Sequence, residues 1–132
     1  MMVTTDWSER GLPVDVLKGG LLVSGMYDLE PVRLSFRNGF LGLDEVAALR
    51  NSSIHHIPQD GPPIIVAYGG EETDEFRRQS QTFAQAWRDK GHQCQLVEMA
   101  GRHHYSLTAD LSDPHCAMVA PFLEQIGVTA TV

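Results

Sequence analysis

Apolar and polar positions along the chain alternate in blocks that predict short strands separated by helices. Apolar runs bounded by glycines or polar loops predict buried strands at residues 19–25, 64–69 and 93–99. Apolar residues at helical spacing predict helices at residues 43–50, 74–90 and 114–126. Because short buried strands alternate with helices, we expect a single domain of the α/β class, with parallel strands joined by helical crossovers.

The segment 74–90 has the most pronounced helical pattern. Its predicted core residues share one face of the helix and are Phe76, Phe83 and Trp87. Arg77 and Arg78 are expected on the solvated face, where one of them can also tie down the preceding loop. We expect the core side chains to pack this helix against the sheet.

The remaining segments are less regular. Residues 1–9 are typical of the end of a helix, stopped by Gly11 and Pro13. Turn-forming residues predict irregular structure over 26–40 and a loop over 52–63. Pro114 is expected near the first turn of the last helix.

Candidate chemistry gathers in the loops after the second and third strands. GGEETDE follows the second strand, and AGRHHYS follows the third. In parallel sheets, ligands bind beyond the carboxyl ends of the strands, so both loops are expected at the functional edge. A carboxylate there can orient an imidazole that acts as a general base.

Several residues compete for these two roles. The acidic loop offers Glu71, Glu72, Asp74 and Glu75, and the next loop offers His103 and His104. Asp74 can instead cap the following helix, and Glu75 can interact with the helix dipole. Glu72 and His104 stand 32 residues apart (104 minus 72), which leaves room for one helix and one strand.

Three segments of the chain resemble the C-terminal half of the α/β-hydrolases, and most of all the branch of the arylformamidases (kynurenine formamidases) and related esterases. These segments are SGMYDLEP, GGEETDEFRRQS and GRHHYS. The resemblance covers roughly residues 1–126 and implies that Glu72 is the triad acid and His104, in the pair His104-Tyr105, the general base. Many family members have Asp where Glu72 stands. The resemblance also implies that Asp28 braces the loop near the catalytic histidine.

The family's nucleophile is a serine in Gly-x-Ser-x-Gly, and none of the eight serines lies in that motif. Ser24, in LVSGM, comes nearest but ends a different strand. The resemblance places the nucleophile a few residues before Met1. The chain, residues 1–132, would then be the C-terminal portion of a hydrolase domain that lacks the upstream strands and the nucleophile elbow, and weak or absent activity is expected of it alone.

The resemblance implies hydrolysis of a carboxylic ester or an aryl formamide, the family substrate being N-formylkynurenine in tryptophan catabolism. No metal or organic cofactor is implied. An open edge at the strand 19–25 favours a homodimer or a complementing N-terminal half. The alternative is a truncated non-catalytic fragment or pseudoenzyme that acts as an interaction module.

Composition and charge limit the classes of binding partner and the cellular compartment expected for this protein. The formal net charge is −7, so no basic surplus is available to neutralise nucleic acid. No apolar run approaches the roughly 20 residues that span a bilayer, and the first residues do not resemble a signal peptide. Cys94 and Cys116 are expected to be reduced and buried. A cytoplasmic protein is therefore expected.

A metal site is a weaker interpretation of the histidines. The chain holds the pairs His55-His56, His103-His104 and His115-Cys116. Adjacent side chains of this kind are poorly placed to share one ion, and no zinc-type spacing appears. We therefore expect no metal.

Overall fold

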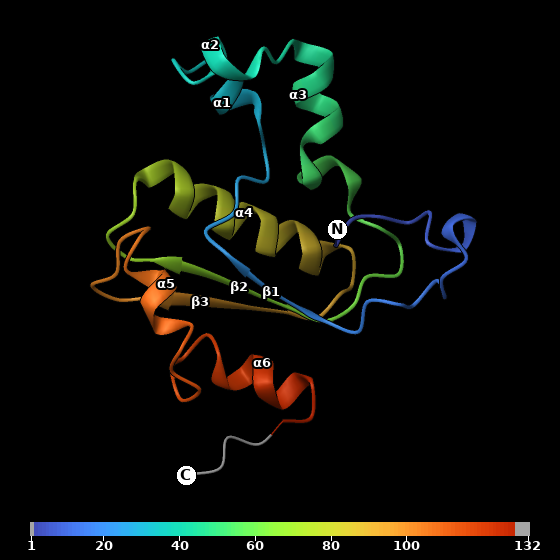
Figure 1. Cartoon of the computed structure of the whole chain (residues 1–132), viewed down its shortest axis with the longest axis vertical. Coiled ribbons are helices and arrows are strands. Elements are labelled where there is room, and N and C mark those ends of the chain that lie inside the picture. Colours follow the sequence, from blue (N-terminus) through green and yellow to red (C-terminus); the bar gives the residue numbers. More distant parts are fainter. Residues whose placement is uncertain (1, 129–132) are drawn as a thin grey trace.

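A three-stranded parallel sheet forms the centre of the molecule in the computed structural model, which describes residues 2–128 (Figure 1). The strands are β1 (Gly20–Val23), β2 (Ile64–Gly69) and β3 (Cys94–Met99), and they lie side by side in chain order. Gly20 pairs with Ile64, and Ile64 pairs with Cys94, so all three strands run from the same edge of the sheet. The predicted α/β class is confirmed.

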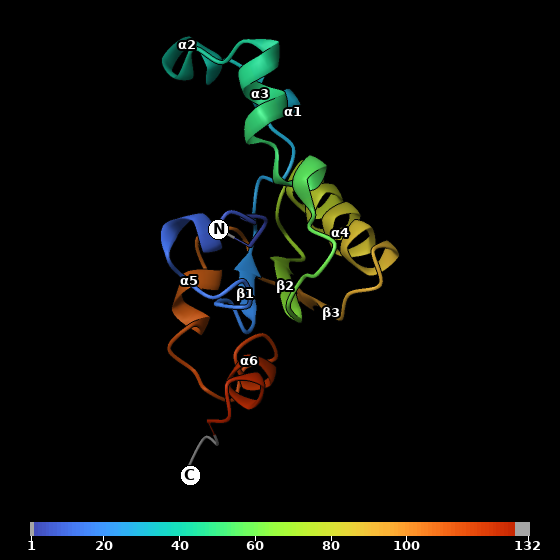
Figure 2. The same ribbon diagram turned by 90° about the vertical axis from the view of Figure 1, so that its right-hand side faces the viewer.

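The core lies on both faces of β2, whose residues are all buried. One face carries a cluster with α4 (Asp74–Asp89), made of Tyr27, Ile64, Val66, Phe83, Ala84 and Trp87. The other face carries Ile65, Ala67, Val97, Leu107, Met118 and Val119. Figures 1 and 2 show α4 on the first side and the C-terminal helices on the second. Successive side chains of a strand point to opposite faces, so the apolar run of β2 supplies both clusters.

The predicted helix 74–90 is present as α4, with one correction to its core face. Phe83 and Trp87 are 1% and 0% exposed. Phe76 is only half-buried, because its ring lies against His104 and not in the core cluster between α4 and the sheet. The first turn of α4 thus belongs to the strand-end region.

The predicted helix over 114–126 is present only in its second half, as α6 (Ala120–Gln125), and Pro121 rather than Pro114 stands in its first turn. A separate short helix, α5 (Leu107–Asp110), precedes the predicted range. Residues 111–119 form turns, with hydrogen bonds such as Cys116 N to Asp113 O. Met118 and Val119 lie in these turns and are buried against the sheet.

The N-terminal prediction also needs correction. Residues 1–9 do not form the end of an α-helix: the described part has only a 3₁₀ turn, η1 (Ser8–Arg10), and Met1 lies outside the described residues. Gly11 ends η1 with φ 73°, a conformation that glycine adopts without strain. Met2 and Val3 pack against the core cluster beside α4.

A helical excursion separates β1 from β2. It consists of α1 (Glu30–Arg33), α2 (Asn38–Leu41) and α3 (Glu45–Asn51), followed by η2 (Ser53–His56). The predicted helix 43–50 corresponds to α3, whose first turn is capped by Asp44 Oδ1 accepting from Ala47 N at 2.7 Å. The segment 26–40, predicted as irregular, contains α1 and α2. In both views the three helices stand beyond α4, away from the sheet (Figures 1 and 2).

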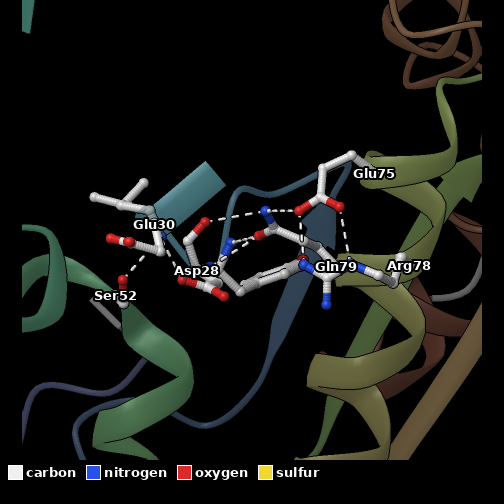
Figure 3. Close-up of polar contacts among 8 residues, drawn as sticks. Asp28, Glu30, Ser52, Glu75, Arg78 and Gln79 are labelled. Carbon is white, nitrogen blue, oxygen red and sulfur yellow. Dashed lines mark hydrogen bonds and ion pairs between the residues drawn. The ribbon is translucent and has the colours of Figure 1, made fainter. Parts of the chain in front are cut away.

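A buried glutamine of α4 fixes the loop that leads into this excursion (Figure 3). Gln79 Oε1 accepts from Tyr27 N at 2.6 Å and from Asp28 N at 2.8 Å, and its Nε2 donates to Asp28 O at 3.0 Å. On the far side, Leu29 N donates to Ser52 Oγ at 2.8 Å. The loop at residues 27–29, where the excursion begins, is thus anchored to α4 through Gln79 and to the residue that follows α3, Ser52.

Candidate active site

The candidate site lies where β2 and β3 end. The loops that follow these strands are joined by backbone hydrogen bonds, from Gly70 N to Met99 O and from Glu71 N to Arg102 O, both at 3.0 Å. Parallel pairing of β2 with β3 brings their carboxyl ends to one edge. The two loops selected from the sequence therefore lie side by side.

Gly69, the last residue of β2, permits this close approach. A Cβ atom at this position would lie 2.1 Å from the backbone oxygen of Arg102. Only glycine fits without a shift of the backbone. The N–H of Gly69 donates to a carboxylate in the next loop.

That carboxylate belongs to Glu72, whose side chain is fully buried. Its Oε2 accepts from Gly69 N and from Ser24 Oγ, each at 2.8 Å. Its Oε1 lies 2.6 Å from His104 Nδ1. Buried carboxylates are costly without such partners, so three donors from three segments explain why an acid is tolerated here.

His104 completes the pair and stays accessible to solvent. Its side chain is 44% exposed, and Phe76 packs on the ring with a centroid distance of 4.5 Å. A carboxylate can only accept, so Nδ1 of the neutral ring carries the proton and Nε2 keeps a lone pair. Among the contacts within residues 2–128, none engages Nε2. The ring is thus oriented by Glu72 on one side and open on the other.

The histidine loop is held by its own contacts. The Arg102 guanidinium donates to both carboxylate oxygens of Asp110, at 2.6 and 3.0 Å, and this pair raises the pKa of Arg102. Leu107 is fully buried below the loop, and Ser106 Oγ bonds the backbone of His103. The loop is therefore tied to α5 and to the core cluster that contains Leu107, on the face of the sheet opposite α4.

The other candidate acids face away from the imidazole. Glu71 is exposed, and Asp74 pairs with Arg77 on the first turn of α4. Glu75 binds Arg78 at 2.7 Å, and the hydrogen bond from that guanidinium lowers the pKa of Glu75. Of the four acids, only Glu72 contacts a histidine among the described residues.

In the part of the chain that the structure describes, neither the side chain of His103 nor that of Asp28 hydrogen-bonds to the pair formed by Glu72 and His104. The His103 ring takes only a long contact, 3.4 Å, from Ser106 N. Asp28 does not brace the histidine loop, contrary to the expectation from the sequence. Its backbone binds Gln79, and its Oδ1 accepts from Glu30 N at 3.0 Å, so it belongs to the base of the excursion (Figure 3). Arg77 does tie the acidic loop, by donating to Gly70 O at 3.3 Å.

Ser24 is part of the site although no motif selected it. It follows β1 directly, is 7% exposed and has φ 48°. Its hydroxyl donates to Glu72 and not to His104, an arrangement that does not suit a nucleophile activated by imidazole. A small polar residue at the end of a predicted strand was the only available signal, and that strand, β1, is half-buried rather than buried as predicted.

Within the described residues, no three His, Cys, Asp or Glu side chains gather in a way that suits a metal ion. Cys94 and Cys116 are free thiols and only half-buried, so the expectation of buried cysteines needs correction. Burial is still sufficient to raise the pKa of the Cys94 thiol. None of the helices in the described part of the chain is long and apolar enough to cross a membrane.

Comparison with known proteins gives two sets of relatives, although no family model matches. The chain is 30% identical over 132 residues to the kynurenine formamidase of Danio rerio and 31% identical over 133 residues to that of Salmo salar. Each match covers 96% of this chain and 45% of the relative. The chain thus spans less than half the length of these relatives.

Solved structures agree on the fold. Esterase 2 of Thermogutta terrifontis, phosphoramylated by tabun, matches with a TM-score of 0.59 and 24% identity, over 93% of this chain and 46% of that one. A candidate thioesterase from a Silicibacter species matches with a TM-score of 0.71 and 24% identity, over 87% and 43%. The chain therefore has the fold of an α/β-hydrolase and is similar to the C-terminal half of the kynurenine formamidases.

Proposed function

We propose that this chain supplies the acid and the base of a serine-hydrolase triad, with Glu72 as the acid and His104 as the base. The observation that carries the proposal is the 2.6 Å contact between the buried Glu72 Oε1 and Nδ1 of the half-exposed His104. A buried carboxylate that orients an imidazole with an open Nε2 is the arrangement that a general base requires.

The chemistry needs a serine that the 132 residues do not offer in a Gly-x-Ser-x-Gly motif. In the proposed reaction, that serine comes from residues upstream of this sequence or from a partner chain. His104 Nε2 takes the serine proton as the oxygen attacks the carbonyl, and returns it to the leaving group. Glu72 stabilises the imidazolium in between. Backbone N–H groups near that serine would bind the oxyanion.

The proposed substrate is a small carboxylic ester or aryl formamide. The relatives named kynurenine formamidase support the formamide, and the structural relatives support the ester. A hollow of about 210 Å³ is bordered by Met26, Val32 and Phe76 among others. Phe76 also packs on His104, so the hollow and the base have this one ring as a common neighbour.

The test begins with the coding sequence upstream of Met1. If it holds an in-frame Gly-x-Ser-x-Gly, the longer protein should hydrolyse an aryl formamide or an ester, and Glu72→Ala and His104→Ala should each lower kcat by roughly 10³- to 10⁴-fold. Glu71→Ala and His103→Ala are matched controls from the same loops and should stay within a few-fold. Full activity of the Glu72 or His104 variant would refute the proposal.

A second candidate function is a non-catalytic interaction module, a homodimer or a partner for a complementing half. The missing motif and the exposed apolar residues of the excursion, such as Phe36 and Phe40, favour it. A fluorophosphonate probe separates the two functions when the upstream residues or the partner chain are present, because a structural relative is phosphonylated by sarin. A serine should then be labelled if the triad is assembled, and none if the chain is an interaction module. The present chain alone should label weakly or not at all under either function. Strong labelling would mean that one of its own serines is nucleophilic.

A further inference from the structure

Ser24 has a backbone conformation that residues other than glycine rarely adopt. Its φ of 48° makes it the only residue other than glycine with positive φ among those described. Glycine adopts this region freely, whereas a Cβ atom there is strained. The position therefore keeps a hydroxyl at a conformational cost.

The surrounding contacts force the conformation from both sides. Ser24 N donates to Ala67 O at 2.8 Å and so extends the pairing of β1 with β2. A few residues later, Gln79 binds the N–H groups of Tyr27 and Asp28 (Figure 3). Strained residues persist where neighbouring structure determines them in this way, and they cluster at functional sites. The hydroxyl is thus aimed from the end of β1 at the neighbouring strand end.

We infer that Ser24 is a positioning residue, which holds the Glu72 carboxylate in the orientation that His104 needs; the inference rests on the proposed function. The carboxylate can turn about its own bond to the side chain. Without Ser24, Oε2 would keep Gly69 N as its only donor, and the carboxylate would be held less firmly against that rotation. The second donor, Ser24 Oγ, fixes the plane of the carboxylate, so that Oε1 faces His104 Nδ1.

The experiment uses the chain itself and needs no catalytic activity. It follows the Nδ1 proton of His104 by NMR and measures its exchange rate with water in Ser24→Ala and Ser24→Gly. Loss of one hydrogen bond to the carboxylate should speed this exchange roughly tenfold in both variants. Ser80→Ala is the matched control, because Ser80 is a buried serine whose hydroxyl has no partner among the described residues. It should leave the exchange rate unchanged.

A merely structural role would give a different result. Glycine relieves the strain at φ 48°, so Ser24→Gly should unfold at the same or a higher urea concentration than Ser24→Ala. If Ser24 only shaped the turn, Ser24→Gly would also restore the exchange rate of the wild type, and the inference would be overturned. Fast exchange in a stable Ser24→Gly variant supports it.

Glu72→Gln separates this inference from the proposed function. If Glu72→Gln alters the His104 proton and the Ser24 variants do not, only the role of Ser24 is refuted. If Glu72→Gln leaves that proton as in the wild type, Glu72 and His104 are not paired in solution. The proposed function would then fail, and the role of Ser24 with it.

Discussion

The strand-end site and the helical excursion are built in opposite ways. At the site, contacts span the sequence: Ser24, Gly69 and His104 all donate to Glu72, whose side chain is fully buried. Between residues 30 and 51, only Val32 and Ala48 are buried. The large apolar side chains that are exposed there are Leu34, Phe36, Phe40, Leu41, Val46 and Leu49.

Their hydrogen bonds differ in the same way. The excursion is held by local contacts, such as Arg33 with Glu30 and Asn38 with the backbone of Leu43. The site depends on the pairing of β1, β2 and β3, because each donor comes from a different strand end. Changes at the site should therefore disturb the whole sheet, whereas changes in the excursion should remain local.

The largest difference is expected between two glycines. Gly69→Ala places a Cβ atom 2.1 Å from the backbone oxygen of Arg102, so one of the two loops must move. We expect the free energy of unfolding to fall by about 3 kcal/mol. Gly39 lies in α2 with open space around it, and Gly39→Ala should raise the free energy of unfolding by up to about 1 kcal/mol.

Urea denaturation followed by circular dichroism measures both changes. Equal effects of Gly69→Ala and Gly39→Ala would show that the strand ends are as loosely held as the excursion. That result would contradict the comparison on which the other predictions rest.

A smaller difference is expected between two glutamates. Glu72→Gln keeps the shape of the side chain but weakens its three hydrogen bonds and places an amide NH₂ near a donor. The free energy of unfolding should fall by about 2 kcal/mol. Glu45 is exposed in α3, so Glu45→Gln should change it by less than about 0.5 kcal/mol. Urea midpoints of the three proteins test this, and a neutral Glu72→Gln would refute the buried network.

Tyr27 lies where the two regions meet, and we expect it to make the free energy of unfolding depend on pH. Burial raises the pKa of its hydroxyl above the usual value near 10. Above that pH the unfolded chain loses the proton while the folded chain keeps it, so stability falls as pH rises. The expected slope is about 1.4 kcal/mol per pH unit, beginning near pH 10. Tyr27→Phe keeps the ring that stacks on Phe83 and should lose this part of the slope.

Unfolding experiments between pH 9 and 11 measure the difference between the wild type and Tyr27→Phe. Tyr105 is 79% exposed and serves as a control, because Tyr105→Phe should leave the slope unchanged. Identical slopes for all three proteins would mean that Tyr27 is open to solvent at the base of the excursion.

The sequence predicted the sheet and the position of the two loops at the strand ends because those features have local signals. A short apolar run such as β2 and an amphipathic segment such as α4 leave periodic patterns. The order of the elements then places the strand ends together. The choice of Glu72 among four acids came from a resemblance, since no local rule separates a buried acid from an exposed one.

Other features depended on contacts that no local pattern contains. Val119 was predicted to lie in the helix 114–126, but it and Met118 are buried against the sheet from a turn that precedes α6. Asp28 looked like a brace for the histidine loop, yet a glutamine 51 residues away holds it. Ser24 could not be found from its neighbours, because its role comes from a carboxylate 48 residues later.

The smallest effect is expected at the tip of the excursion. Phe40 lies in α2 and is 90% exposed, so Phe40→Ser removes almost no packing. The free energy of unfolding should change by less than about 0.5 kcal/mol, as judged by urea denaturation at micromolar protein concentration. Leu107→Ala is the contrasting variant, because Leu107 is fully buried beneath the histidine loop and its loss should cost about 3 kcal/mol. A loss above 1 kcal/mol for Phe40→Ser would mean that its ring is covered in solution, and a dependence of that loss on protein concentration would identify a second copy of the chain as the cover.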